Sequence, residues 1–262
     1  PEFRSYHTEW VGPTSPIGKE EIKKMSPDKF VDYIKSMFKP SEEMFTPSPE
    51  GLARIFQEVV KENPIPYAEK AERFGEEGIY PVYISALFRG FEGAWRDNKY
   101  FDLKPVIALS EKVMKTFKEP EYSKKKDEFH CGRYSWIRGS IANFIEEVVQ
   151  KDERSLTEDE IKDFKEILFF IIENDPDPTE ENEKKYGVEA NNMDYSTYAI
   201  NCNRGKAMHA LIQYALRYAR NHVNKEEEKN QGPFPPGERF ETDVKEFLNK
   251  RLVEEKSPSV QS

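Results

Sequence analysis

Residues 194–223, which read DYSTYAINCNRGKAMHALIQYALRYARNHV, carry the clearest amphipathic pattern of the chain and decide its fold class. Apolar residues recur at the three- and four-residue spacing of one helical face, namely Met208, Leu211, Ile212, Ala215, Leu216, Ala219 and Val223. The opposite stripe is polar and consists of Lys206, His209, Gln213, Arg217 and Arg220. We therefore predict a helix whose apolar stripe lies in the core and whose basic stripe faces solvent.

Other segments show the same helical spacing and have clear start signals. Ser26 and Ser48 each precede a proline and an acidic residue, as an N-cap precedes a proline at the first helical position. Thr157 and Glu160 form a capping-box pair, and Pro81 opens a strongly apolar helix. Strand-like alternation is absent from the sequence. We predict an all-α fold, an irregular α-solenoid or helical-repeat array of about nine or ten helices.

Breaks in the helical pattern divide the chain into segments. In chain order we expect a cloning scar at 1–3, an irregular N-terminal segment at 4–25, a helical-repeat domain at 26–224, a Pro/Gly linker at 225–238, a terminal helix at 239–256 and a disordered tail at 257–262. Because Pro1-Glu2-Phe3 resembles a cloning-site linker, we expect a fragment of a longer protein. The longest stretch without helical periodicity is 174–196, and connections of this length are commonly functional or disordered.

The composition excludes several classes of protein. Hydrophobic residues make up 37% and charged residues 34% of the chain, a ratio that favours an elongated array with a thin core. The net charge of -9 makes nucleic acid an unlikely partner, because phosphate binding needs a surplus of cations. Two widely separated cysteines predict a reducing, cytoplasmic setting. No apolar run is long enough for a membrane span, so we expect no membrane association.

An Arg-Gly pair recurs in three predicted helices. The pairs are Arg89-Gly90, Arg138-Gly139 and Arg204-Gly205. A glycine inside a helix costs about 1 kcal/mol relative to alanine, so close packing of a neighbouring helix is the simplest reason to keep it. We interpret the pairs as a structural packing repeat in which the arginine reaches carbonyls or carboxylates of the next helix. A ligand-binding role for these arginines is the alternative.

The sequence shows no motif for catalysis, a metal or a cofactor. Gly205-Lys206 lacks the upstream glycine and the following Ser or Thr of a phosphate-binding loop. The spacing of Cys131, Cys202 and His209 fits no known metal-ligand motif, and buried cysteines are the simpler interpretation. With 49 acidic residues, neighbouring acids are expected on solvated helix faces. We therefore predict no catalytic residue, no metal and no cofactor.

Four stretches together resemble a known family. They are residues 49–53, 80–95, 136–149 and 198–201, the last leading into Arg204-Gly205. Their order is similar to that in the C-terminal helical-repeat region of large prokaryotic STAND-type NTPases, the antiviral Avs-like proteins. In that family an effector and an NTPase precede a helical sensor, which binds a viral protein and triggers oligomerisation. The resemblance implies a sensor at residues 26–224, whereas an NTPase motif is absent from this chain.

These observations predict a non-catalytic module that binds a protein, a viral protein if the resemblance holds. The predicted partner-binding residues surround the start of the 194–223 helix: Tyr195, Asn201, Asn203, Arg204, Lys206 and Arg217. The Asn side chains can bind either a partner's backbone or the free groups at the helix start, so a purely structural role remains open. The alternatives are a stand-alone helical-repeat scaffold, a small helical enzyme, and a nucleic-acid binder that uses the stripe from Lys206 to Arg220.

Overall fold

The computed structural model describes residues 13–36, 47–116, 134–175, 200–229 and 238–254, together with Thr197. All the regular elements in these ranges are helices, so the predicted all-α class is confirmed. In chain order they are α1 (Lys19–Lys23), α2 (Pro27–Ser36), α3 (Pro49–Glu62), α4 (Ile65–Glu69), the 3₁₀ helix η1 (Ala71–Gly75), α5 (Pro81–Arg96), α6 (Lys104–Thr116), α7 (Tyr134–Gln150), α8 (Glu158–Asn174), α12 (Asn203–Lys229) and α13 (Glu238–Glu254).

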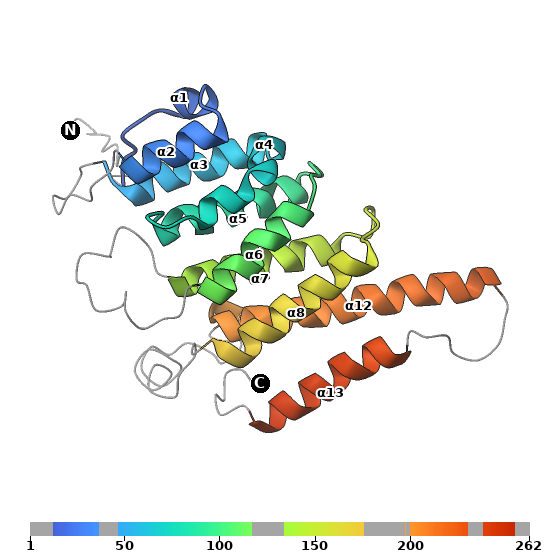
Figure 1. Ribbon diagram of the computed structural model, residues 1–262. Helices are drawn as coiled ribbons and strands as arrows, with labels where there is room; N and C mark the ends of the chain where they lie inside the picture. The colour runs from blue at the N-terminus through green and yellow to red at the C-terminus, as the bar shows by residue number, and fades with distance from the viewer. Residues whose placement is uncertain are drawn as a thin grey trace, which may run out of the picture.

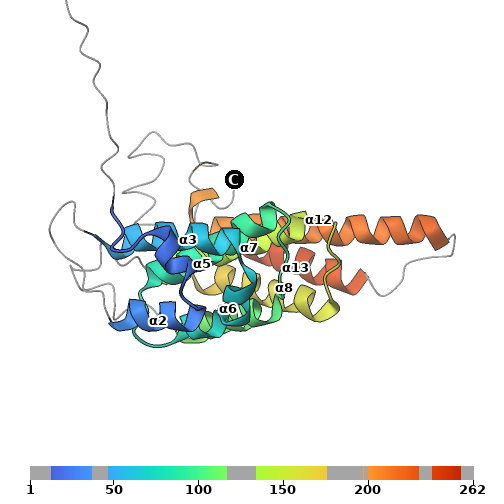
Figure 2. The ribbon, with the colours of Figure 1, turned by 90° about the horizontal axis from the view of Figure 1, so that it is seen from above.

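The helices form two layers, which we call row A and row B (Figures 1 and 2). Row A contains α3, α5, α7 and α12, each packed against the next. Row B contains α2, η1, α6 and α8. The last helix, α13, contacts α12, and its Phe247 ring stacks on Phe169 of α8 with ring centroids 3.8 Å apart. Successive elements alternate between the rows, so the chain advances steadily from α1 to α13.

The helices of row A run parallel. Gly90 of α5 lies against Val60 of α3, and Gly93, one turn later, lies against Lys61. Gly139 of α7 lies against Asn203 at the start of α12. Further along the same two helices, Arg217 of α12 reaches the end of α7. All row A helices therefore start at one edge of the array and end at the other.

The core is thickest around α5, which is covered by α3 on one side and α7 on the other. Phe91 and Phe144 have ring centroids 6.1 Å apart, and both rings also contact Phe101. Aromatic residues at helical spacing contribute to this core, and Phe88, Phe91, Trp95 and Tyr214 are all buried. Tyr218 is only half-buried.

The predicted helix starts are largely confirmed. The Ser48 hydroxyl accepts a hydrogen bond from the Gly51 amide at 3.1 Å. The capping box of Thr157 and Glu160 is complete at the start of α8. Two boundaries differ from the prediction: α1 lies inside the segment expected to be irregular, and α12 continues to Lys229, into the expected linker. The expected tail, 257–262, lies outside the described residues.

A lysine or arginine joins each row A helix to the preceding one. Lys99, just after α5, donates to the carbonyl oxygens of Lys61 and Glu62 at the end of α3. Lys151, just after α7, donates to the Trp95 and Arg96 carbonyl oxygens of α5 at 3.0 and 2.6 Å. A cation near the unpaired carbonyl groups of a helix end is stabilising, so this device links the row A helices in series.

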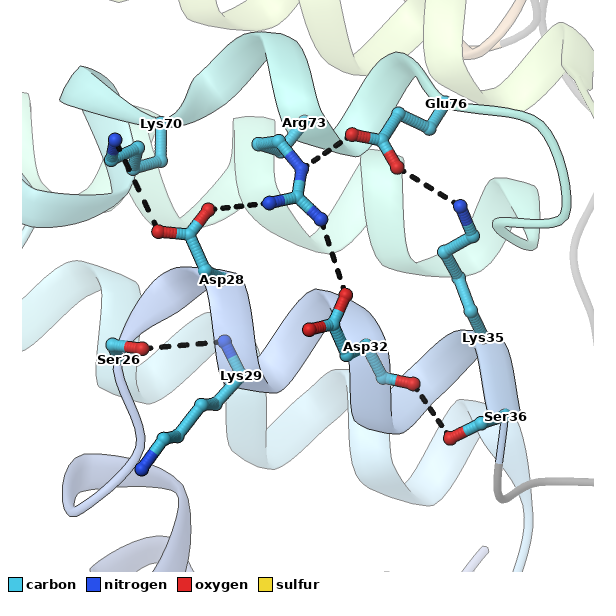
Figure 3. A network of polar contacts seen from close by, with 9 residues as sticks. All are labelled: Ser26, Asp28, Lys29, Asp32, Lys35, Ser36, Lys70, Arg73 and Glu76. Carbon is cyan, nitrogen blue, oxygen red and sulfur yellow. Dashed lines mark hydrogen bonds and ion pairs between the residues drawn. The ribbon is translucent and has the colours of Figure 1, made fainter.

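An ion-pair network joins α2 to η1 in row B (Figure 3). Arg73 contacts the carboxylates of Asp28 at 2.7 Å and Asp32 at 3.2 Å, and it also pairs with Glu76. Lys35 of α2 pairs with Glu76 at 2.9 Å. These side chains are partly exposed, so we assign the network to orientation of the two elements rather than to large stabilisation.

The predicted orientation of α12 is right only in part. Leu211 of the expected core stripe is buried, and Met208 and Ala215 are half-buried against the core. Ile212, Leu216 and Ala219 of that stripe are exposed. The buried face is instead formed by Asn203, Ala207, Ala210, Leu211, Tyr214 and Arg217. The error arises because α12 is apolar on two faces, and the array covers only one of them.

Candidate protein-recognition site

A buried polar cluster, which we call the Asp175 junction, lies where α7, α8 and α12 meet. Asp175, directly after α8, accepts a hydrogen bond from the guanidinium of Arg138 at 3.1 Å. The same Oδ2 atom accepts from the amide of Asn203 at 3.2 Å. The side chain of Asp175 is 0% exposed and that of Arg138 is 10% exposed. A buried charge needs such partners, so the junction holds the start of α12 against α7.

Gly139 lets α12 approach α7 closely at this junction. A Cβ atom on Gly139 would lie 2.6 Å from the side-chain oxygen of Asn203, which is closer than nonbonded atoms can come. Any larger residue would therefore push Asn203 away from Asp175. The glycine and the buried ion pair depend on each other, and both place the start of α12 accurately.

The predicted partner-binding residues occupy different environments. Asn201 is exposed, and its side-chain amide donates to the Thr197 carbonyl oxygen at 2.7 Å. Asn203 is 6% exposed and belongs to the Asp175 junction, so the structural alternative for this residue is the one that its contacts support. Arg204 and Lys206 are half-buried. Tyr195 lies outside the described residues.

The expectation that Arg217 lies on a solvated stripe is wrong. Arg217 is 4% exposed, and its guanidinium donates to the carbonyl oxygens of Val148, Lys151 and Arg154 at the end of α7. Burial lowers the pKa of Arg217, and Asp152 opposes this effect. The residue is the third cation in the series begun by Lys99 and Lys151, and its place is between helices rather than at a surface.

The three Arg-Gly pairs are not equivalent in space. Gly90 packs on α3, where a Cβ atom would lie 2.6 Å from Cβ of Val60, whereas Gly139 packs on α12. Arg89 is exposed, while Arg138 is buried against Asp175. Gly205 is buried in the first turn of α12, where its amide donates to the sulfur of Cys202 at 3.3 Å. The contacts of Gly90 and Gly139 are both close helix–helix packing, but the three Arg-Gly pairs do not form one repeated arrangement.

The edge at which α7 and α12 begin presents large apolar side chains to solvent. Trp136 is 46% exposed and Ile200 is 58% exposed. Trp136 lies three residues before Gly139 of α7, and Ile200 lies three residues before Asn203, the first residue of α12 and the one that Gly139 contacts. We call Trp136, Ile200 and the exposed Asn201 the α7/α12 edge. The exposure of Trp136 is not evident from sequence, because Trp136 directly precedes the buried Ile137 in an apolar helical pattern.

No group of three or more metal-ligating side chains comes together in the described ranges. His209 pairs with Glu146 of α7 at 3.0 Å, and Cys202 is buried. Cys131 lies outside the described residues. Among the described helices, none combines the length and the apolar composition that a bilayer span requires.

Comparisons with known proteins found no relative of this chain. No family model matches the chain, no curated protein matches it, and no solved structure matches it.

Proposed function

We propose that this chain is a non-catalytic protein-recognition module in which the α7/α12 edge contacts the partner. Its rows A and B, linked in series, act as an α-solenoid that holds this edge in place. The resemblance to the sensor region of STAND-type NTPases suggests a viral protein as the partner and antiviral defence as the role. The observation that carries the proposal is the pair of exposed apolar side chains, Trp136 and Ile200, beside a rigid buried junction.

The packed Asp175 junction behind Trp136 and Ile200 supports a recognition role. Interface energy is concentrated in a few aromatic and apolar anchors, and tryptophan is prominent among them. An anchor on a fixed backbone loses less conformational freedom on binding than one on a free loop. Arg138 and Asp175 fix the two helix ends behind Trp136 and Ile200, and Gly139 fixes their separation.

Affinity capture with matched variants tests this proposal. The immobilised chain is exposed to lysates of phage-infected and uninfected bacteria, and captured proteins are quantified by mass spectrometry. We expect a phage protein whose capture falls at least about 10-fold when Trp136 and Ile200 are both replaced by serine. The control is Ile65→Ser, because Ile65 is 51% exposed but lies on α4.

The outcomes separate the proposal from its alternative. Equal capture by the wild type and by the Trp136→Ser, Ile200→Ser variant would remove the α7/α12 edge from the recognition surface. A partner found equally in both lysates, and lost in the same variant, would instead favour a scaffold for a host complex. Circular dichroism of each variant serves as the control for folding, and capture is compared only between variants that retain their helix content.

A further inference from the structure

The helix α13 contacts the rest of the array through one narrow face. Among its described side chains only Val244 is fully buried, while Phe247 and Leu248 are half-buried against the core. With the half-buried Arg251 they follow the i, i+3, i+4 and i+7 spacing of a single helix face. The side chains on the other side of α13 are exposed, namely Asp243, Lys245, Glu246, Asn249 and Lys250.

The side-chain contacts between α13 and α8 are shallow. The stacked rings of Phe247 and Phe169 are both half-buried. Lys165 of α8 lies 3.7 Å from the carboxylate of Asp243, whose side chain is 60% exposed, so this ion pair contributes little. We therefore expect α13 to undock at a lower free energy than the rest of the array needs to unfold.

Arg251 binds the end of α8 by the device that links row A. Its guanidinium donates to the Ile172 carbonyl oxygen in the last turn of α8 at 2.6 Å. Lys99, Lys151 and Arg217 make the same kind of contact with carbonyl oxygens at the ends of α3, α5 and α7. Carbonyl groups in the last turn of a helix have no partner within the helix, so a cation beside them is stabilising.

The last turn of α8 also positions Asp175. The backbone amide of Asp175 donates to the Ile171 carbonyl oxygen at 2.9 Å, and the next carbonyl group, that of Ile172, is the one that Arg251 binds. The side chain of Asp175 in turn accepts hydrogen bonds from α7 and α12 at the Asp175 junction. A continuous set of contacts therefore leads from α13, through the end of α8, to the start of α12.

We propose that α13 is a conformational strap. When docked, it fixes the last turn of α8 through Arg251 and thereby keeps Asp175 in place, and its release loosens the start of α12. The array stays folded on release, because α8 keeps a separate core face that consists of Phe164, Ile167, Leu168, Ile171 and Ile172. The strap acts on the junction whether or not a partner binds the α7/α12 edge, so its test is independent of the proposed function.

The thiol of Cys202 provides a native probe of the strap. Cys202 directly precedes α12 and is 3% exposed, so a thiol reagent reaches it only when the start of α12 opens. In the full chain carrying Cys131→Ala, Arg251→Met is expected to raise the labelling rate of Cys202 at least about 10-fold, because a hydrogen bond from a charged group to the end of α8 is lost. The matched control is Lys250→Met, which removes an exposed cation from the same turn and should leave the rate unchanged.

A second labelling site separates release of the strap from general unfolding. Leu52 in α3 is fully buried near the other end of the array. In a chain without Cys131 and Cys202, labelling of Leu52→Cys should not be accelerated by Arg251→Met. Equal acceleration at positions 52 and 202 would overturn the proposal, as would an unchanged rate at Cys202.

A variant of the junction tests whether the effect passes through Asp175. In an Asp175→Asn background the link is already broken, so Arg251→Met should no longer accelerate labelling of Cys202. Asn203→Ala, which removes only the contact with α12, is the milder second background. The same acceleration in these backgrounds as in the wild type would show that α13 protects Cys202 without the junction, and it would overturn the proposal.

Discussion

At the scale of single residues, the interior of the array is held by charged groups as well as by apolar ones. The carboxylate of Asp175 is fully buried between Arg138 and Asn203, and it connects three helices. Exposed ion pairs contribute little, whereas loss of one partner from a buried pair leaves an uncompensated charge. Loss of a buried carboxylate should therefore lower the free energy of unfolding more than loss of an exposed one.

Asp175→Asn is expected to lower the free energy of unfolding by about 3–5 kcal/mol, because the buried guanidinium of Arg138 loses the negative charge of the carboxylate that it contacts. Glu166→Gln serves as the control, since Glu166 and Lys162 are 60% and 66% exposed and their contact is long, at 3.8 Å. The control should lose no more than about 0.5 kcal/mol in urea unfolding. A loss of similar size in both variants would show that the Asp175 junction is not a stabilising contact.

The pH dependence of stability is expected to contain a contribution from Glu62. Hydrogen bonds from Lys19 and Lys23 lower the pKa of Glu62 from 4.5 to about 2. Because the folded pKa is depressed, the contribution is complete above pH 4.5 and is lost as the pH falls towards 2. The difference in unfolding free energy between wild type and Glu62→Gln should shrink over that range.

Replacement of both lysines provides the control for this pH effect. In a Lys19→Gln, Lys23→Gln background, the Glu62→Gln change should no longer alter the pH profile between 4.5 and 2. If the profile still changes there, another group holds the Glu62 carboxylate, and α1 is not tied to α3 by these pairs.

At the scale of helices, the starts were predictable from sequence, whereas the buried face of α12 was predictable only in part. The starts of α3 and α8 depend on neighbouring residues, Ser48 with Gly51 and Thr157 with Glu160, so a short window of sequence contains the whole interaction. The buried face of α12 depends on which neighbours the array supplies. Apolar residues lie on two sides of α12, and its packing on α7 and α8 decides which of them are buried.

Lys151→Met is expected to lower the free energy of unfolding by about 1.5–3 kcal/mol, because hydrogen bonds from a charged group to the end of α5 are lost. Lys115→Met is the control, since Lys115 is 75% exposed and contacts only Glu111 of its own helix in the described contacts. The control should change stability by less than about 0.5 kcal/mol in the same urea titration. Equal effects would contradict the series of cations that links row A.

At the scale of the whole molecule, the residues of the candidate site were predictable from sequence only in part. The start of α12 was expected from sequence to be a functional junction, but Asn203 and Arg217 turn out to be internal contacts. Their partners are 28 and 69 residues away in sequence, at Asp175 and Val148, so no local pattern reveals them. Trp136 was missed for the opposite reason, since its spacing matches core residues although α7 exposes it.

The central structural claim is that α12 packs into the array through one apolar face and presents the other. Single cysteines on the two faces, in a chain without Cys131 and Cys202, test this claim by the rate of thiol labelling under native conditions. We predict that Ile212→Cys and Leu216→Cys react faster than Leu211→Cys and Ala210→Cys by on the order of 100-fold, since the latter pair is buried. Equal protection at all four positions, or faster labelling at 210 and 211, would contradict the account.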